Sequence, residues 1–147
     1  MWRASSGDLW LDAYVSDFLS RAREEGHPVP DIPFQSALDN LANAVASHTD
    51  FENGGEGLAY ALMVLAREGQ ASMGDLRYYA DVKAPEFATA LALGQLGAAL
   101  AMYGDQPRAD AMFSAGLARL STPRELESAP SWRVDYGSRL REKRIKK

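Results

Sequence analysis

The sequence predicts an all-α fold of antiparallel helical hairpins, arranged as an α-solenoid or as part of an αα-toroid. Apolar residues recur at helical spacing along most of the chain, and no stretch alternates apolar and polar residues between turn signals as a strand would. Three of the expected helices end at a glycine, at Gly26, Gly69 and Gly104. These glycines recur at intervals of roughly 35–45 residues, which is typical of a helical-hairpin repeat.

The first expected pair of helices covers residues 8–25 and 34–47. Asp8 is a suitable N-cap for the first helix, and Gly26 with the prolines behind it ends that helix. Its apolar residues are expected to form one buried stripe, made of Leu11, Val15, Phe18 and Ala22. In the second helix the expected buried stripe consists of Phe34, Ala37, Leu38, Leu41 and Val45.

The later pairs are expected at residues 57–68 with 72–82 and at 86–103 with 106–120. The third and fifth helices are apolar nearly all round, which predicts an inner layer of odd-numbered helices and an outer layer of even-numbered ones. The sixth helix has one apolar stripe, Ala109, Met112, Phe113, Gly116, Leu117 and Leu120. Leu62 and Leu96 are expected to be fully buried, whereas replacements at Glu24 or Arg108 are expected to change the free energy of unfolding by no more than about 0.5 kcal/mol. The first helix fits the inner layer less well, because it carries four polar residues, Asp12, Ser16, Asp17 and Ser20.

The domain organisation divides at residue 121. Residues 1–121 form the helical-hairpin repeats, and residues 122–147 are expected to form a linker, the start of a further helix and a basic tail. The further helix is indicated by apolar residues at i, i+4 and i+8, which are Trp132, Tyr136 and Leu140.

The composition of the chain excludes several kinds of functional site. The 147 residues suit one globular domain, with 46% hydrophobic and 24% charged residues. A net charge of −4 gives no indication of a nucleic-acid partner. The absence of cysteine excludes disulfides, thiolate metal sites and cysteine nucleophiles.

Residues 1–6 lack the pattern of a signal peptide. The apolar segment 87–103 is shorter than a membrane span requires, so we expect a core helix there.

The chain offers no catalytic, cofactor-binding or metal-binding residues that we can predict. His27 and His48 fall in different turns, while a zinc site needs several converging ligands. The acidic pairs Glu24–Glu25 and Asp12/Asp17 are expected on solvated faces, where nothing would raise a carboxyl pKa. We therefore expect a protein that is not an enzyme and that needs no cofactor.

Two other patterns have a structural and a functional interpretation. The run Gly54-Gly55-Glu56-Gly57 precedes a helix, where an anion could bind, but it lacks a P-loop ending and is better interpreted as a hinge between repeats. The aromatic residues are expected in core packing, with a ligand pocket as the alternative. They are Trp10, Tyr14, Phe18, Tyr78 and Tyr79.

Several stretches resemble one protein family. The run from Asp8 to Ala22, D-L-W-L-D-A-Y-V-S-D-F-L-S-R-A, resembles the W-L-T-A-Y-V-x-D-F-L-x-R-A run of bacterial α2-macroglobulins. Four later stretches are similar to the same family in the same order, at residues 59–67, 74–77, 96–105 and 132–141. The resemblance covers roughly residues 8–141 and implies a piece of the thioester (complement-like) domain, which is an αα-toroid.

The resemblance implies a fragment of a bacterial endopeptidase inhibitor, a protease trap of the periplasm or cell envelope. In that family a Cys-x-Glu-Gln thioester captures the protease, and no position of this chain can inherit that role. The family continues into another apolar helix after Arg141, so we expect a fragment cut inside its domain. Its expected partners are proteases, through the parent protein, the remaining domains of that protein, and a second copy of the fragment that covers its unpaired end helices.

Two other functions stay open from the residues. One is a free-standing helical-repeat module that binds a protein partner. The other is a toroid enzyme that acts on a small ligand, such as a relative of the terpenoid cyclases. Aspartate-rich metal motifs would favour the enzyme, and the sequence contains none.

Overall fold

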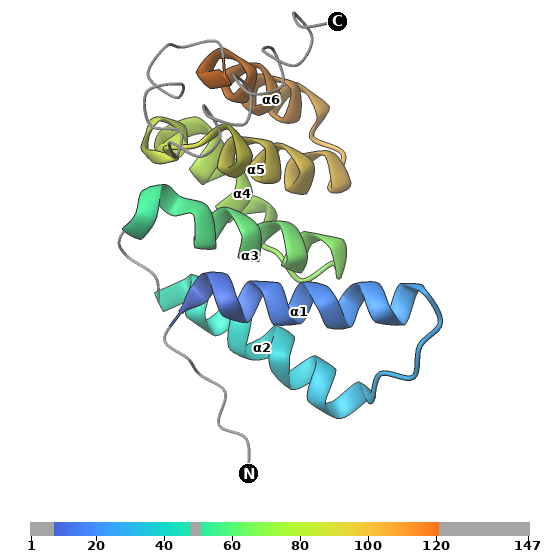
Figure 1. Ribbon diagram of the computed structural model, residues 1–147. Coiled ribbons are helices and arrows are strands. Elements are labelled where there is room, and N and C mark those ends of the chain that lie inside the picture. The colour runs from blue at the N-terminus through green and yellow to red at the C-terminus, as the bar shows by residue number, and fades with distance from the viewer. Residues whose placement is uncertain (1–7, 48–50, 121–147) are drawn as a thin grey trace, which may run out of the picture.

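The computed structural model describes residues 8–47 and 51–120. Within these residues, six α-helices follow one another without a strand, as the sequence predicts (Figure 1). They are α1 (Leu9–Glu24), α2 (Asp31–Ser47), α3 (Glu56–Arg67), α4 (Met73–Tyr78), α5 (Ala90–Met102) and α6 (Gln106–Leu120). Figure 1 shows α1, α3 and α5 running in the same direction, with α2 and α6 returning in the opposite one. The antiparallel hairpin fold is therefore confirmed.

The observed bounds of the fourth and fifth helices differ from the expected ones. The fourth helix was expected to continue to residue 82, but α4 passes at Tyr79–Lys83 into a π-helical turn and at Ala84–Glu86 into a 3-10 turn. The fifth helix starts at Ala90 rather than at residue 86, because the Thr89 side chain caps it by accepting a hydrogen bond from the amide of Ala92 at 3.1 Å.

The core lies between the row α1, α3, α5 and the helices that pack against it. In that row α3 lies between α1 and α5, while α2 packs against α1 and α3. The helices α4 and α6 both pack against α5. Because α3 and α5 are covered on more than one side, they are apolar nearly all round, and Leu62 and Leu96 are fully buried as expected.

Each of the three hairpins turns at a glycine with the same geometry. Gly26, Gly69 and Gly104 have positive φ angles of 83°, 70° and 80°, a conformation that residues with a side chain rarely adopt. The amide after each glycine donates a hydrogen bond back to the last turn of the helix, as in a Schellman motif. These bonds are His27 to Ala22 at 2.9 Å, Gln70 to Leu65 at 2.8 Å and Asp105 to Leu100 at 3.0 Å. The repeat predicted from the glycine spacing is therefore present in the backbone.

The buried face of α1 is the opposite of the predicted one. Leu11, Val15 and Phe18 are 42%, 47% and 65% exposed, so the prediction of a buried stripe is wrong for them. The buried residues of α1 are instead Ala13, Ser16, Asp17 and Ser20. Helical spacing identifies the apolar face of a helix correctly, but it does not show which face packs against the neighbouring helix.

The predicted buried stripe of α6 is only partly correct. Ala109, Met112 and Gly116 are buried as expected, whereas Phe113, Leu117 and Leu120 are exposed. The small residues allow α6 to approach α5 closely. At Gly97 of α5 an added Cβ would lie 2.7 Å from the ring of Phe113, so close contact excludes a side chain there. In α2 Phe34, Leu38, Leu41 and Val45 are buried as predicted, whereas Ala37 is only half-buried.

The predictions for residues 122–147, including Trp132, Tyr136 and Leu140, lie outside the described residues. Within residues 8–47 and 51–120, none of the helices has the length and hydropathy needed to cross a membrane.

We expect the core of α3 and α5 to dominate stability. Leu62→Ala and Leu96→Ala should each lower the free energy of unfolding by about 2–5 kcal/mol, because each leaves a cavity among fully buried side chains. Urea denaturation followed by circular dichroism measures this. The control Glu24→Ala, at an exposed site, should change the free energy by no more than about 0.5 kcal/mol. Equal losses in the control and the two core variants would contradict the assigned core.

Candidate functional site

The residues considered as ligands in the sequence are not brought together. His27 is exposed in the turn after α1, and His48 lies outside the described residues. Glu24 and Glu25 are exposed. Within the described part of the chain, no three histidine, cysteine or acidic side chains are placed to hold a metal ion. The polar groups that do converge form two clusters between helices.

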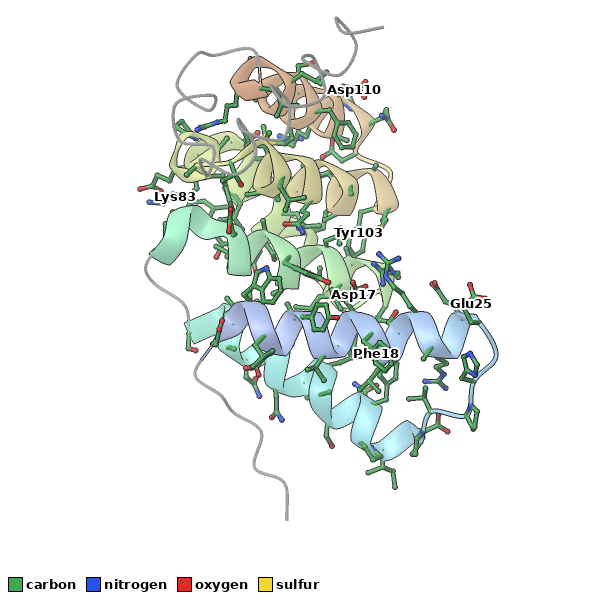
Figure 2. The ribbon with its side chains drawn as sticks, viewed as in Figure 1. Asp17, Phe18, Glu25, Lys83, Tyr103 and Asp110 are labelled. Carbon is green, nitrogen blue, oxygen red and sulfur yellow. The ribbon has the colours of Figure 1, made fainter. Side chains whose placement is uncertain are left out.

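The first cluster joins α1 to α3 around a buried carboxylate. Asp17 accepts hydrogen bonds from the Tyr60 hydroxyl at 2.5 Å, from Arg67 Nη1, and from Arg21 Nε at 3.0 Å. Figure 2 shows Asp17 on the side of α1 that faces α3. The expectation that Asp17 is solvated is wrong, because α3 supplies the donors that a buried carboxylate requires.

Ser20 extends this cluster by one turn of α1. Its hydroxyl donates a hydrogen bond to a carboxylate oxygen of Glu68, which follows α3 directly. The hydroxyl of Ser16 donates to the backbone carbonyl of Asp12 at 2.8 Å, which satisfies it inside its own helix. No buried side-chain nitrogen or oxygen among the described residues lacks a hydrogen-bond partner.

The pKa shifts in the first cluster follow from these contacts. Burial acts to raise the pKa of Asp17, but the hydrogen bonds from Tyr60, Arg67 and Arg21 outweigh it, so this pKa lies below its ordinary 3.8. Burial and the hydrogen bond to Asp17 raise the pKa of Tyr60 to about 12. Asp17 is therefore an anion and Tyr60 a neutral donor at neutral pH, which describes a structural contact rather than an acid–base pair.

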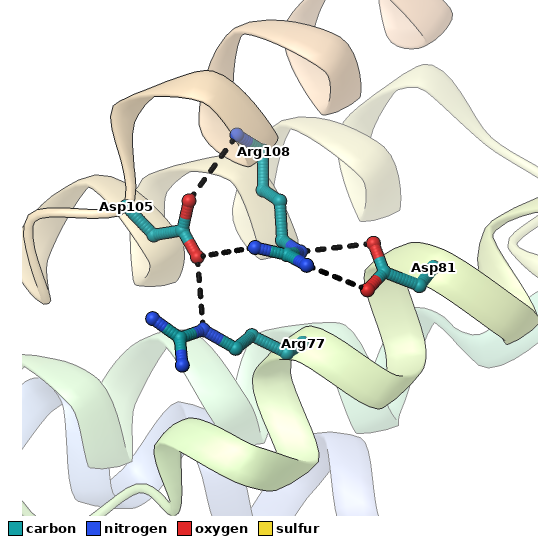
Figure 3. Close-up of polar contacts among 4 residues, drawn as sticks. All are labelled: Arg77, Asp81, Asp105 and Arg108. Atoms are coloured by element: carbon teal, nitrogen blue, oxygen red, sulfur yellow. Dashed lines mark hydrogen bonds and ion pairs between the residues drawn. The ribbon is translucent and has the colours of Figure 1, made fainter.

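The second cluster joins the α4 segment to the start of α6 (Figure 3). Arg108 donates two hydrogen bonds to the Asp81 carboxylate, at 2.9 and 2.8 Å, and a third to Asp105 Oδ2 at 3.0 Å. Arg77 Nε donates to the same Asp105 oxygen at 3.1 Å. Two arginines and two aspartates from three segments therefore form one ionic network.

Charge pairing governs the pKa values in this network as well. Burial of Asp105 acts to raise its pKa, yet the hydrogen bonds from Arg77 and Arg108 lower it. The pKa of Asp81 is lowered by the Arg108 guanidinium. Hydrogen bonds to both carboxylates raise the pKa of Arg108. Arg108 therefore holds two carboxylates, a role that the expectation of a near-neutral replacement at this position did not include.

The aromatic residues divide between two environments. Phe51, Tyr79 and Phe87 contact one another edge to face, with ring centroids 4.9 to 6.2 Å apart. Phe51 and Phe87 lie against Gly55, where an added Cβ would be 2.8 Å from each of these two rings. Gly54 and Gly55 therefore lie in a tightly packed connection between the first two hairpins.

The aromatic residues of α1 do not form the expected core. Trp10 stacks on Tyr14 with centroids 5.5 Å apart and meets Tyr60 edge to face, and Phe18 projects away from α3. Trp10, Tyr14 and Phe18 are all more than two-fifths exposed. Core packing is thus wrong for Tyr14 and Phe18, which lie on an open face of α1, and also for Tyr78, which is 48% exposed.

The sequence did carry a signal for the clusters that residue chemistry missed. Asp17, Arg67, Arg77 and Asp105 each lie inside one of the stretches that resemble bacterial α2-macroglobulins. In the structure these residues pair across helices that are far apart in the sequence. The family-like stretches therefore supply the Asp17–Arg67 and Arg77–Asp105 contacts between hairpins, whereas Asp81 and Arg108 lie outside them.

These observations define a helical-hairpin repeat protein in which ionic clusters lock neighbouring hairpins. A comparison with protein-family models gives no match. The chain is 34% identical to the Alpha-2-macroglobulin of Escherichia coli strain K12, over 92% of this chain and 8% of that protein. It is 33% identical to the Alpha-2-macroglobulin of Xylella fastidiosa strain Temecula1, over 97% of this chain and 9% of that protein.

Solved structures agree with the sequence comparisons. The crystal structure of native alpha-2-macroglobulin from E. coli, spanning domain MG7 to the C-terminus, matches with a TM-score of 0.67 and 32% identity, over 76% of this chain and 19% of that one. Salmonella alpha-2-macroglobulin reacted with methylamine matches with a TM-score of 0.68 and 30% identity, over 76% of this chain and 8% of that one. The chain is homologous to bacterial alpha-2-macroglobulins, and it spans less than a tenth of the length of these curated relatives.

The Asp17 cluster predicts a pH-dependent stability. Because the native pKa of Asp17 is lowered, the carboxylate stabilises the fold above pH 3.8, and this contribution is lost as the pH falls through the native pKa. Asp17→Ala should cost about 2–4 kcal/mol at pH 7, since it leaves Arg67 without its buried partner. The difference from wild type should shrink between about pH 5 and pH 2. A difference that does not change with pH would contradict the ionic role of Asp17.

The Arg108 network predicts that this arginine matters more than an arginine in a single surface pair. Arg108→Ala should lower the thermal unfolding midpoint clearly more than Arg23→Ala, because Arg108 holds two carboxylates, whereas Arg23 forms an ion pair with only Asp31 among the described residues. Thermal melts of both variants by circular dichroism measure the difference. Equal midpoints would show that the network adds nothing to stability.

Proposed function

We propose that this chain is a helical structural part of a bacterial alpha-2-macroglobulin-like endopeptidase inhibitor, a protease trap. The observation that carries the proposal is the collinear match to alpha-2-macroglobulins over 92–97% of the chain. The role is structural, because the family resemblance assigns the covalent chemistry to a Cys-x-Glu-Gln thioester and this chain contains no cysteine.

The described contacts support a part that moves as one body. The Asp17 cluster fastens α1 to α3, and the Arg108 network fastens the α4 segment to the start of α6. Both involve short, paired ionic contacts, which resist sliding of one hairpin past the next. A ring segment of this kind would shield a thioester supplied by another part of the same protein and would follow it when a protease triggers the trap.

Location and partners follow from the same proposal. The periplasm or cell envelope is the expected compartment, and proteases are the partners of the whole inhibitor. The remaining domains of the inhibitor would contact the faces left open here. For the chain by itself we infer association with a second copy, supported by the large apolar side chains that α1 exposes. The match to much longer alpha-2-macroglobulins favours this function over a free-standing interaction module.

A segment exchange tests the function. Residues 9–120 would replace the matching segment of the E. coli relative, and the hybrid would be mixed with trypsin and analysed by denaturing electrophoresis. We expect covalent trypsin conjugates from the hybrid, because the segment keeps its helical scaffold, and none from the isolated chain, which cannot form a thioester.

The unaltered relative is the control for conjugate formation, and gel filtration with circular dichroism shows that the hybrid is folded. A folded hybrid that forms no conjugate would overturn the structural equivalence of the segment. A stable adduct between trypsin and the isolated chain would overturn the assignment of the chemistry to another part of the inhibitor.

A further inference from the structure

The segment that follows α4 has an uncommon backbone conformation. Tyr79–Lys83 forms a π-helical turn, which leads into the 3-10 turn Ala84–Glu86. Each hydrogen-bonded ring of a π turn holds one more residue than that of an α-helix, and such turns are found mostly as single turns inside α-helices, frequently at functional sites. The sequence by itself predicts an ordinary α-helix as far as residue 82, so contacts with other elements must account for the wider turn.

On one side, the π turn is held by the start of α6 (Figure 3). The carboxylate of Asp81, in the middle of the turn, accepts hydrogen bonds from Arg108 Nε at 2.9 Å and from Arg108 Nη2 at 2.8 Å. Arg108 is itself oriented by Asp105, whose side chain is 7% exposed and accepts a hydrogen bond from Arg108 Nη1 at 3.0 Å. Two parallel bonds from one guanidinium fix the orientation of the Asp81 carboxylate as well as its distance.

On the other side, the π turn contacts the connection between the first two hairpins. The ring of Tyr79 meets the ring of Phe51 edge to face, with centroids 6.2 Å apart. Lys83 Nζ lies 5.9 Å from the centroid of the same Phe51 ring. Tyr79 and Lys83 each lie two positions from Asp81, and residues two apart along a helix point to nearly opposite sides. The π turn is therefore held between α6 and Phe51.

The residues after the π turn leave little room for a change in its register. Phe87 is fully buried, and the amide of Ala88 donates a hydrogen bond to the carbonyl of Gly54 at 2.9 Å. A Cβ added at Gly54 would clash with the Cβ of Ala88, so the two backbones are in direct contact. Before the turn, the fully buried Leu76 fixes α4. Because an α-helical turn takes up fewer residues than a π turn, a change to α-helix would rotate Phe87 and Ala88 about the helix axis relative to Leu76.

We propose that the π turn Tyr79–Lys83 couples the start of α6 to the connection between the first two hairpins, with the Arg108–Asp81 pair as the clamp that keeps the turn in its π form. When the clamp is released, the turn converts to α-helix and its contacts with Phe51 and Gly54 are lost. Because both sides act on one conformational equilibrium, the coupling is reciprocal, and a change at Phe51 also loosens the clamp. The coupling is a property of the chain itself and does not depend on the proposed function.

Removal of the clamp tests the proposal, by NMR spectroscopy and amide hydrogen exchange of the full chain. In Asp81→Asn we expect the nuclear Overhauser contacts between the Tyr79 and Phe51 rings to be lost. The amide of Ala88 should exchange at least about tenfold faster, because its hydrogen bond opens with the turn. The amide of His27, which is hydrogen-bonded in the turn of the first hairpin, should keep its rate within about threefold.

Two further variants complete this experiment. Arg108→Lys keeps the positive charge but cannot bond both carboxylate oxygens as a fork, so it should change the ring contacts and the exchange rate in the same direction. Asp31→Asn is the matched control, since Asp31 pairs with Arg23 at an exposed site, and it should leave both readouts unchanged. Circular dichroism establishes whether each chain is folded.

A folded Asp81→Asn chain that keeps the ring contacts and the wild-type exchange rate at Ala88 would overturn the proposal. A chain that either clamp replacement unfolds would also overturn it, because the Arg108–Asp81 pair would then hold the whole fold rather than one turn. Because the trypsin experiment uses the long relative, its outcome is independent of this one.

A change on the opposite side of the turn tests the reciprocity. Phe51→Leu keeps an apolar side chain but removes the ring that Tyr79 and Lys83 contact. Because one equilibrium connects the two sides, the Nε–H of Arg108 should exchange with solvent faster in this variant, by about the same factor as the amide of Ala88. An Arg108 Nε–H that keeps its wild-type exchange rate would overturn the coupling.

Discussion

The arrangement of the first hairpin depends on the buried carboxylate of Asp17. A carboxylate out of water requires donors, and the Tyr60 hydroxyl and the Arg67 guanidinium are the groups that α3 offers. This requirement fixes which face of α1 turns toward α3, and the small residues of that face, Ala13 and Ser16, allow the helices to approach. The opposite and more apolar face of α1 is then left outside.

A similar constraint operates at the other end of the molecule. Asp105 follows the turn at Gly104 and accepts hydrogen bonds from Arg77 and Arg108. Nearby, between α5 and α6, Gly97 and Gly116 allow these two helices to come into close contact. Polar contacts at the helix ends therefore set the register of the hairpins, while small residues set the distance between them.

The sequence predicts the hairpins well because their signals are local. The Asp8 cap, the turn glycines and the apolar periodicity of α3 and α5 each act within a few residues. The face that α1 buries could not be predicted in this way, since it depends on Tyr60 and Arg67, more than forty positions away. The ionic partners could not be predicted for the same reason. Charged residues in a helix are expected on its solvated face unless their partners on other helices are known. The family-like stretches contained part of that information, since they include Asp17, Arg67, Arg77 and Asp105.

The helix α1 makes polar contacts on the face that packs within the chain and leaves its more apolar face exposed. Within the chain, α1 is held by directional hydrogen bonds and ion pairs, which specify one orientation but gain little from burial. The apolar residues that would provide most of the free energy of burial remain outside, on the face that carries Leu11, Val15 and Phe18. The geometry of α1 is therefore set by contacts within the chain and does not depend on what covers its outer face.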